Sequence, residues 1–202
     1  MKQALVFATN NAHKIAEIRQ QLGDRYTFRS LADIGCTEAI PETADTLEGN
    51  ALLKARHVQD NYQQDCFSED TGLEVYALHG APGVGTAHYA GPARSAEANN
   101  QKLLSELASR KDRLARFRTV ICLLQDGEEH YFEGVCEGRI GTCPIGRAGF
   151  GYDPVFIPRE GDGRSFAQMT MDEKAAFSHR ARAMAKLEEH LKTRAGAVHP
   201  TA

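Results

Sequence analysis

The sequence contains no tryptophan, only five cysteines and no long hydrophobic run. The cysteines stand at positions 36, 66, 122, 136 and 143, and no two of them form a C-x-x-C pair. Their odd number and wide spacing disfavour a disulfide framework and a zinc site. We therefore expect scattered free thiols, buried in a protein of a reducing compartment.

No apolar stretch approaches the roughly 18 residues that a membrane-spanning helix needs. The apolar segment ALVFA (4–8) has only five residues before the chain turns polar, and such a segment is too short for the core of a signal peptide. We expect a cytoplasmic protein without a membrane partner. The net charge of -3 argues against nucleic acid as a partner, but a few basic residues in one cleft can still bind a small anion.

Several common nucleotide and metal motifs are also missing. The chain has no G-x-x-x-x-G-K-[ST], no G-x-G-x-x-G after a strand and no H-E-x-x-H. These absences exclude a P-loop enzyme and disfavour a dinucleotide-binding enzyme or a zinc peptidase. Any phosphate chemistry must therefore use another arrangement.

The hydrophobic pattern predicts intermixed strands and helices in one domain or two lobes. We expect a domain over 1–194 and a disordered tail over 195–202. Periodicity predicts helices at 12–22, 46–64, 96–108 and 178–192. It predicts strands at 4–8, 65–78, 115–125, 129–140 and 155–157, with an acidic turn in the second and loops at 80–85 and 146–154. The long hairpin over 115–140 favours an α/β or α+β class with a mixed sheet.

A polar turn between the first strand and the first helix is the first candidate site. It comprises Thr9, Asn10, Asn11, Ala12, His13 and Lys14. The free N–H groups and positive dipole end of a helix favour an anion, so this turn can hold phosphates. The alternative is that an asparagine merely caps the helix and that Lys14 is solvated.

Acidic residues form the second candidate site. Glu69 and Asp70 are adjacent and precede Thr71 and Gly72, and Glu42 lies in a loop before a helix. Carboxylate oxygens suit Mg²⁺. The alternative for residues 68–72 is an ordinary exposed turn.

Two later segments offer contacts to a planar ligand. In Gly149–Pro154, glycines flank Phe150 and Tyr152, which lets an aromatic ring approach a ligand closely. The alternative is a tight turn with packed aromatics. In the second segment, Lys174 precedes Ser178-His179-Arg180 at a predicted helix start, where cations oppose the dipole. A ligand-binding role explains that placement better than a structural role does.

Taken together, these segments resemble the inosine triphosphate pyrophosphatase family, also called the Ham1-like or non-canonical purine NTP pyrophosphatase family. The matching segments are ATNNAHKIAEI, TLEGNALLKA, EDTGLEV, GAPGV, ARF, GFGYDPVF and EKAAFSHRARA. They extend from residue 8 to about residue 184, and GFGYDP followed by K-x-x-x-x-HR is very specific.

The resemblance implies an Mg²⁺-dependent enzyme that cleaves ITP, dITP or XTP between the α- and β-phosphates. It implies an elongated two-lobed α/β fold: a long mixed sheet, helices on both sides and a central nucleotide cleft. It also implies a homodimer. A related pyrophosphatase for modified pyrimidines and a nucleotide-binding module without catalysis are the alternatives. The GFGYD and SHR segments favour purines, and intact Asp70, Glu42 and Lys14 favour catalysis.

The resemblance also implies roles for single residues. Thr9 to Lys14, Lys54 and Thr71 would contact phosphates and sugar; Glu42 and Asp70 would hold the metal, with Asp70 as general base. The residues expected around the base are Phe150, which would stack on it, Gly151, Tyr152, Asp153, Lys174, His179 and Arg180.

The chain departs from the family pattern at four positions. Glu69 replaces an aspartate, Gly85 and His88 replace an aromatic residue and an arginine, and Ala181 replaces a glycine. We expect these changes to affect rate and substrate preference more than reaction class.

Overall fold

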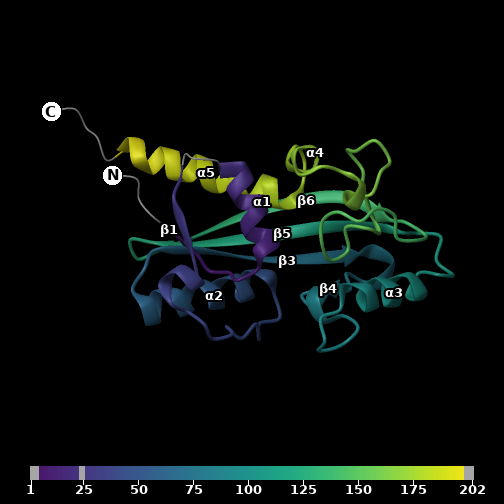
Figure 1. The fold of residues 1–202 in the computed structure, drawn as a ribbon, viewed down its shortest axis with the longest axis horizontal. Coiled ribbons are helices and arrows are strands. Elements are labelled where there is room, and N and C mark those ends of the chain that lie inside the picture. Colours follow the sequence, from purple (N-terminus) through teal and green to yellow (C-terminus); the bar gives the residue numbers. More distant parts are fainter. Residues whose placement is uncertain (1–4, 23–25, 198–202) are drawn as a thin grey trace.

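The computed structural model describes residues 5–22 and 26–197 of the 202-residue chain (Figure 1). The helices are α1 (Ala12–Leu22), α2 (Leu47–Tyr62), α3 (Ala96–Glu106), α4 (Met171–Ala175) and α5 (His179–Ala197). The strands are β1 (Leu5–Phe7), β2 (Phe28–Ser30), β3 (Cys66–Val75), β4 (Pro82–Gly83), β5 (Leu114–Gln125), β6 (Glu128–Ile140) and β7 (Phe156–Pro158).

The strands form one mixed sheet in the order β2-β1-β3-β5-β6-β7, with β4 on the edge of β3. β1 is parallel to β2 and β3, whereas the pairs β3–β5, β5–β6 and β6–β7 are antiparallel. The predicted α/β class and mixed sheet are therefore confirmed. The long β5–β6 hairpin gives the molecule its elongated shape (Figure 1). It turns at Asp126-Gly127, where both residues have positive φ, as a two-residue hairpin turn requires.

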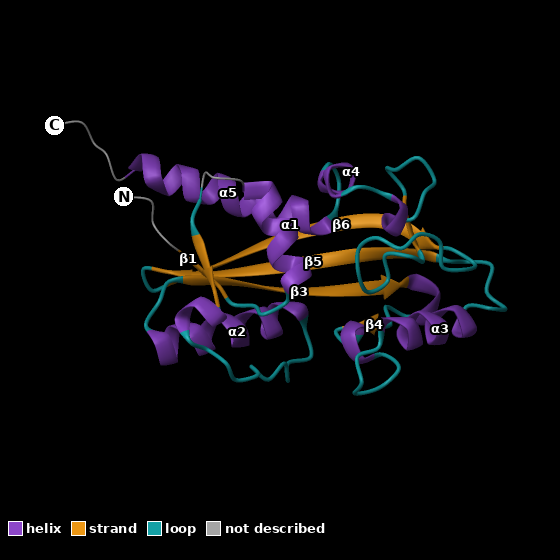
Figure 2. Ribbon diagram, viewed as in Figure 1, coloured by secondary structure: helices purple, strands orange, loops and turns teal. Residues whose placement is uncertain are grey.

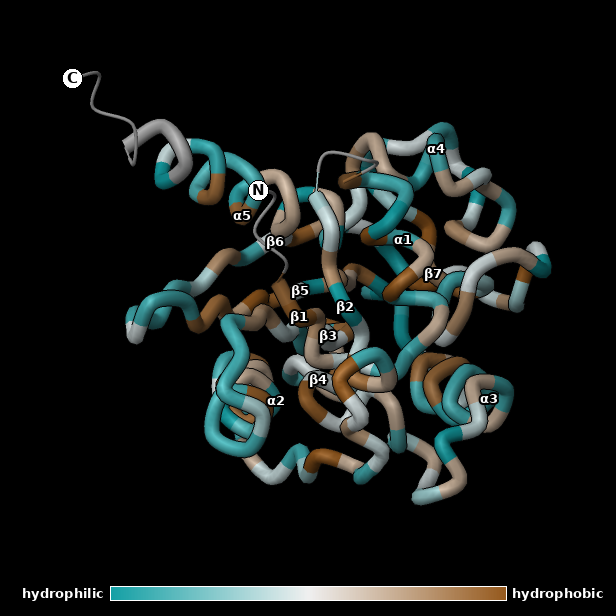
Figure 3. Tube along the Cα trace, turned by 60° about the vertical axis from the view of Figure 1, so that its left-hand side comes forward, coloured by the Kyte–Doolittle hydropathy of each residue, from teal (hydrophilic) through white to brown (hydrophobic). Residues whose placement is uncertain are grey.

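Helices cover both faces of this sheet (Figure 2). Alternate residues of β1 and β5 point to opposite sides: Phe7 and Ile121 pack with α1 and α5, whereas Val6 and Cys122 pack with α2. This double burial explains why β1 and residues 120–124 of β5 are continuous apolar runs, and Figure 3 shows brown segments between the helices.

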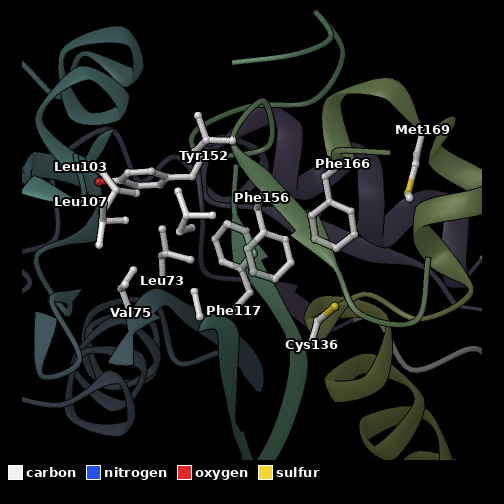
Figure 4. Close-up of a cluster of buried hydrophobic side chains, with 13 residues drawn as sticks. Leu73, Val75, Leu103, Leu107, Phe117, Cys136, Tyr152, Phe156, Phe166 and Met169 are labelled. Carbon is white, nitrogen blue, oxygen red and sulfur yellow. The ribbon is translucent and has the colours of Figure 1, made fainter. Parts of the chain in front are cut away.

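A third hydrophobic cluster fills the other end of the molecule, where α3 and the segment after β6 meet the sheet. The rings of Phe117 and Phe156 lie 4.7 Å apart, and Phe166 lies 5.1 Å from Phe156 (Figure 4). The division of the core into clusters at two ends gives the two lobes.

Several local predictions are wrong. The acidic turn expected within 65–78 does not exist, because β3 continues through Ser68–Gly72 and pairs with β5 at each residue. The sequence pattern also missed β2 and α4, which are short, and β4, which lies inside the predicted loop 80–85. These elements are only two to five residues long, which is too short for a hydrophobic period to show.

The C-terminal helix is longer than the sequence predicts. α5 continues to Ala197, three residues into the segment expected to be disordered, and residues 198–202 lie outside the described residues, as does position 4 of the predicted first strand.

All five cysteines are free; four are buried, as expected, and Cys143 is exposed. No helix among the described residues is long and apolar enough to cross a membrane.

The contact between β6 and α5 generates a stability prediction. A Cβ at Gly134 would lie 2.0 Å from the His179 carbonyl oxygen and 2.4 Å from the Ala183 amide nitrogen, so only glycine lets the helix approach. We expect Gly134→Ala to lower the free energy of unfolding by about 1–3 kcal/mol, measured by urea denaturation. The matched control is Gly141→Ala, whose Cβ would meet its nearest atom at 3.5 Å. Equal effects of the two changes would contradict this account.

Candidate active site

The open edge of β3 forms the floor of a cavity. β1 pairs with β3 only at Cys66 and Phe67, and β4 pairs only at Leu73 and Glu74. Between these two contacts, at 68–72, no described strand pairs with β3 on that side. A cavity of about 930 Å³ lies there, lined by the ends of β1 and β4, by the loop before α2 and by the start of α5.

The cavity brings together nearly all residues that the sequence nominated. Its lining includes Thr9, Asn10, Asn11, Lys14, Glu42, Lys54, Asp70, Thr71, Phe150, Gly151, Tyr152, Asp153, Lys174, His179 and Arg180. Ala12 and His13 are not among the lining residues, although α1 begins at Ala12. The His13 ring instead stacks on Phe150, with centroids 5.2 Å apart.

The polar turn caps α1. The Asn11 side-chain oxygen accepts from the backbone N–H groups of His13 and Lys14, at 3.0 and 3.2 Å. Capping, which was the structural alternative for this residue, is therefore confirmed. The same alternative was wrong for Lys14, which is not solvated but lies 2.9 Å from Glu69 Oε1.

A lysine joins two carboxylates on the α2 side of β3. Lys54 Nζ donates to Glu42 Oε1 at 2.7 Å and to Asp70 Oδ1 at 2.9 Å. Burial disfavours charge on Lys54, but the two carboxylates outweigh it and raise the pKa of the lysine. Burial opposes ionisation of Glu42 too, but Lys54 holds the pKa of that carboxyl below its usual value. Lys54 and Glu42 are therefore both charged at neutral pH.

Glu69 lies on the opposite face of the strand. Arg180 Nε and Nη2 donate to its two oxygens at 2.8 and 3.0 Å, and Lys14 approaches from α1. Burial raises the pKa of Glu69, but Arg180 and Lys14 outweigh it and hold that pKa below its usual range. Because side chains alternate along a strand, Glu69 cannot join Asp70 and Glu42 in one oxygen cluster.

Glu17, which the sequence reasoning missed, links two basic residues of the last nominated segment, Lys174 and Arg180. Its carboxylate accepts from Lys174 Nζ at 2.8 Å and from Arg180 Nη1. Burial raises the pKa of Glu17, but Arg180 and Lys174 outweigh it and lower that pKa overall. Glu17 stands three residues after Lys14 on one helical face, which was the signal that could have found it.

The loop after β6 presents Phe150 beside two cations. Asp153 Oδ2 accepts from the Phe150 backbone N–H at 2.9 Å and from Lys174 Nζ at 2.8 Å, which fixes the loop. Lys174 Nζ and Arg180 Cζ lie 5.4 and 5.6 Å from the centre of the Phe150 ring. Gly149 has a φ of +74°, and a Cβ there would meet Asp153 Oδ2 at 2.0 Å, so this turn requires glycine.

Tyr152 contributes to this wall mainly through packing. Its side chain is buried in the cluster around Phe117, and its hydroxyl donates to the Thr86 carbonyl oxygen at 3.0 Å. The carbonyl oxygen of Gly151 accepts from Asn100 Nδ2 at 3.1 Å. Both contacts tie the loop after β6 to the lobe that contains α3.

His179 is buried at the cavity wall with one nitrogen unpaired. Its ring stacks on Phe117 at 4.6 Å, and Nδ1 has no hydrogen-bond partner among the described residues. Burial, followed by Arg180 and Lys174, lowers its pKa well below 6.5, so the imidazole is neutral at pH 7. A buried, unpaired nitrogen at a cavity wall is available to a ligand.

Three of the four positions at which the chain departs from the family pattern lie at or beside this cavity. Gly85 and His88 line it, and Glu69 forms the ion pairs described above, whereas Ala181 is not among the lining residues.

Arg94, which the sequence reasoning also missed, reaches Glu42 Oε2 at 3.5 Å from a largely exposed position. No local pattern marks Arg94, because its partner lies 52 residues away.

The low pKa of His179 predicts a pH effect on stability. The unfolded histidine gains a proton as pH falls through 6.5, whereas the folded one does not, so stability present above 6.5 is lost below it. This loss amounts to at most about 1.4 kcal/mol per pH unit. We expect the free energy of unfolding, measured with urea, to fall less steeply in His179→Gln than in the wild type. The exposed His79→Gln control should follow the wild type, and parallel curves for all three proteins would refute this explanation.

The comparison with known proteins agrees with this geometry. A profile of the Ham1 family matches residues 5–190. The dITP/XTP pyrophosphatase of Flavobacterium psychrophilum is 50% identical over 188 residues, which are 93% of this chain and 98% of that protein. The dITP/XTP pyrophosphatase of Porphyromonas gingivalis is 54% identical over 190 residues, 94% of this chain and 97% of that protein.

Solved structures show the same likeness. A HAM1 protein from Coxiella burnetii has a TM-score of 0.86 at 35% identity, covering 96% of this chain and 100% of that one. The Ham1 protein of Staphylococcus aureus has a TM-score of 0.85 at 34% identity, covering 95% and 99%. Since sequence and fold match over nearly the whole length, the chain belongs to the Ham1 family.

Proposed function

We propose that this protein hydrolyses non-canonical purine nucleoside triphosphates (ITP, dITP and XTP) to the monophosphate and pyrophosphate. Such a reaction would remove deaminated purines from the nucleotide pool. Relatives at 50–54% identity carry the name dITP/XTP pyrophosphatase. The observation that carries the proposal is that one cavity joins the Glu42–Lys54–Asp70 cluster to the wall made by Phe150 and His179. The cluster suits a triphosphate, and the wall suits a base.

The carboxylate cluster fits Mg²⁺. Glu42 and Asp70 present oxygen atoms to one point, which Lys54 Nζ occupies at 2.7 and 2.9 Å, so this position already accommodates a cationic group. Carboxylate oxygens are the ligands that Mg²⁺ prefers. When bound there, Mg²⁺ would neutralise charge on the phosphates and polarise the bond that breaks.

In this proposal Asp70 is the general base. It would take a proton from a water molecule, whose oxygen attacks the α-phosphorus while the bond to the bridging oxygen of pyrophosphate breaks. Asn50 Nδ2 lies 3.4 Å from Asp70 Oδ2 and Lys54 bonds Oδ1, so the carboxylate is held from both sides. Lys54 would lose its bonds to the carboxylates when substrate enters and would then contact a phosphate.

The turn at Thr9–Lys14 would bind phosphates and sugar. Backbone N–H groups at the start of α1 and the positive end of its dipole favour a negative group. Lys14 already neutralises Glu69 at 2.9 Å, so its charge is directed toward the floor of the cavity. Thr71 adds a hydroxyl from the same floor; its Oγ1 lies 2.6 Å from that of Thr119.

The opposite wall would read the base. Phe150 would stack on it after displacing the His13 ring, and His179 would offer its free nitrogen. Hypoxanthine and xanthine carry an acceptor oxygen where adenine carries an amino group. A donor fixed by burial discriminates between them, because adenine would leave both polar groups unpaired, an effect that can reach about 10⁴-fold. Arg180 gives its hydrogen bonds to Glu69, Glu17 and Thr71, so it would act here mainly through its charge.

The cellular setting belongs to the same proposal. We propose a cytoplasmic location, where the nucleotide pool is, and a homodimer, which the family resemblance implies. Sedimentation of the purified protein tests the dimer directly.

A substrate panel tests the reaction and the base preference together. We expect pyrophosphate release from ITP and XTP with Mg²⁺, and little release from ATP or GTP or after removal of the metal. Release of single phosphate, or equal cleavage of all four, would contradict the proposal. Faster turnover of a modified pyrimidine triphosphate would support the pyrimidine alternative, and ITP binding without cleavage would support the non-catalytic one.

The role of Asp70 predicts a sharp loss of activity on substitution. Asp70→Asn keeps the volume but removes the charge and the basicity, so we expect kcat to fall at least about a hundredfold, measured as pyrophosphate release. The control is Asp60→Asn, an exposed position on α2, which should keep wild-type kcat. Circular dichroism confirms folding, and turnover by Asp70→Asn above a few per cent of wild type would exclude Asp70 as the base.

A further inference from the structure

A second group of metal-ligating side chains lies beside the cavity, where the segment before α2 meets that helix. The ligand atoms of Cys36, Glu38 and His57 all lie within 4.8 Å of one another. His57 Nε2 is 3.8 Å from Cys36 Sγ and 2.9 Å from Glu38 Oε1. The group contains a sulfur, a nitrogen and an oxygen, unlike the oxygen pair of Glu42 and Asp70.

We propose that Cys36, Glu38 and His57 form a second metal site, for Zn²⁺ or a similar divalent ion. Sulfur, imidazole and carboxylate are the ligands of zinc sites, and three protein ligands leave one position for water. Bonds of about 2.0–2.3 Å to a tetrahedral ion place ligand atoms about 3.3–3.8 Å apart. The sulfur–nitrogen distance of 3.8 Å fits, and a small rotation of the exposed Glu38 side chain completes the geometry.

Neighbouring groups support these ligands. The Tyr62 hydroxyl donates to Glu38 Oε1 at 3.0 Å, and Asn61 Nδ2 lies 3.5 Å from His57 Nδ1. Asn61 Nδ2 also donates to the His57 carbonyl oxygen at 2.8 Å, and when Nε2 binds a metal, Nδ1 carries the proton. Partners of this kind orient metal ligands, so the group has a supporting shell as well as three ligand atoms.

The site differs from the usual sequence patterns, which is why cysteine spacing gave no sign of it. Its ligands come from positions 36 and 38 in the segment before α2 and from position 57 within α2. A metal would replace the bond between His57 and Glu38 by bonds that join these two parts of the chain. The segment continues to Glu42, and α2 carries Lys54, so an occupied site would fix these two residues relative to each other.

Cobalt titration tests the site independently of nucleotide hydrolysis. Co²⁺ is added to the full-length protein in saturating Mg²⁺, which occupies oxygen-only sites, and the sulfur-to-metal charge-transfer absorption is recorded. We expect one equivalent to bind and Zn²⁺ to displace it. Cys36→Ser and His57→Gln should each weaken binding about tenfold or more, since loss of even a supporting group costs about 10–100-fold.

Two further variants make the result decisive. Cys143→Ser removes the exposed cysteine and should bind Co²⁺ as the wild type does. Glu38→Gln changes an exposed side chain, so it tests the site even if substitution of the buried Cys36 impairs folding. The inference is wrong if the absorption is absent, or if it persists unchanged in the Cys36, Glu38 and His57 variants.

Discussion

The pairing of β3 with β5 fixes the direction in which each charged group of the cavity floor points. Ten consecutive residues of β3 are paired, so no turn interrupts the acidic segment and its side chains alternate strictly. Asp70 therefore meets α2, whereas Glu69 meets α1 and α5. Because the other edge of β3 is covered only at its ends, one ligand in the cavity can reach groups on both faces of the sheet.

The two faces use buried charge differently. Lys54 between Glu42 and Asp70 forms an ion cluster that, in the proposed reaction, a substrate and a metal would open. Arg180 with Glu69 and Glu17 is more fully enclosed. Removing one partner of such a buried pair costs about 3–5 kcal/mol, because a charge is left uncompensated. The Glu42–Lys54–Asp70 cluster can therefore rearrange during a reaction, whereas the Arg180–Glu69–Glu17 cluster keeps its side chains in place.

Aromatic packing extends that fixed wall to His179, beside which the proposal places the base. His179 begins α5, stacks on Phe117 and touches Gly134 through its carbonyl, so the sheet itself sets the imidazole position. Burial keeps this ring neutral, which leaves it free to donate or accept one hydrogen bond. Preorganised polar groups of this kind discriminate between bases, since they cannot move to satisfy the wrong one.

The sequence by itself determined the longer helices and strands, the mixed sheet, the family and fifteen residues of the cavity lining, because these depend on local periodicity and on short motifs. Tertiary structure alone decided the face on which Glu69 lies, the partnership of Glu17 with Lys174 and Arg180, and the approach of Arg94 to Glu42. It also assembled Cys36, Glu38 and His57. These contacts join residues distant in sequence, and strand register and helix packing, which no local pattern encodes, bring them together.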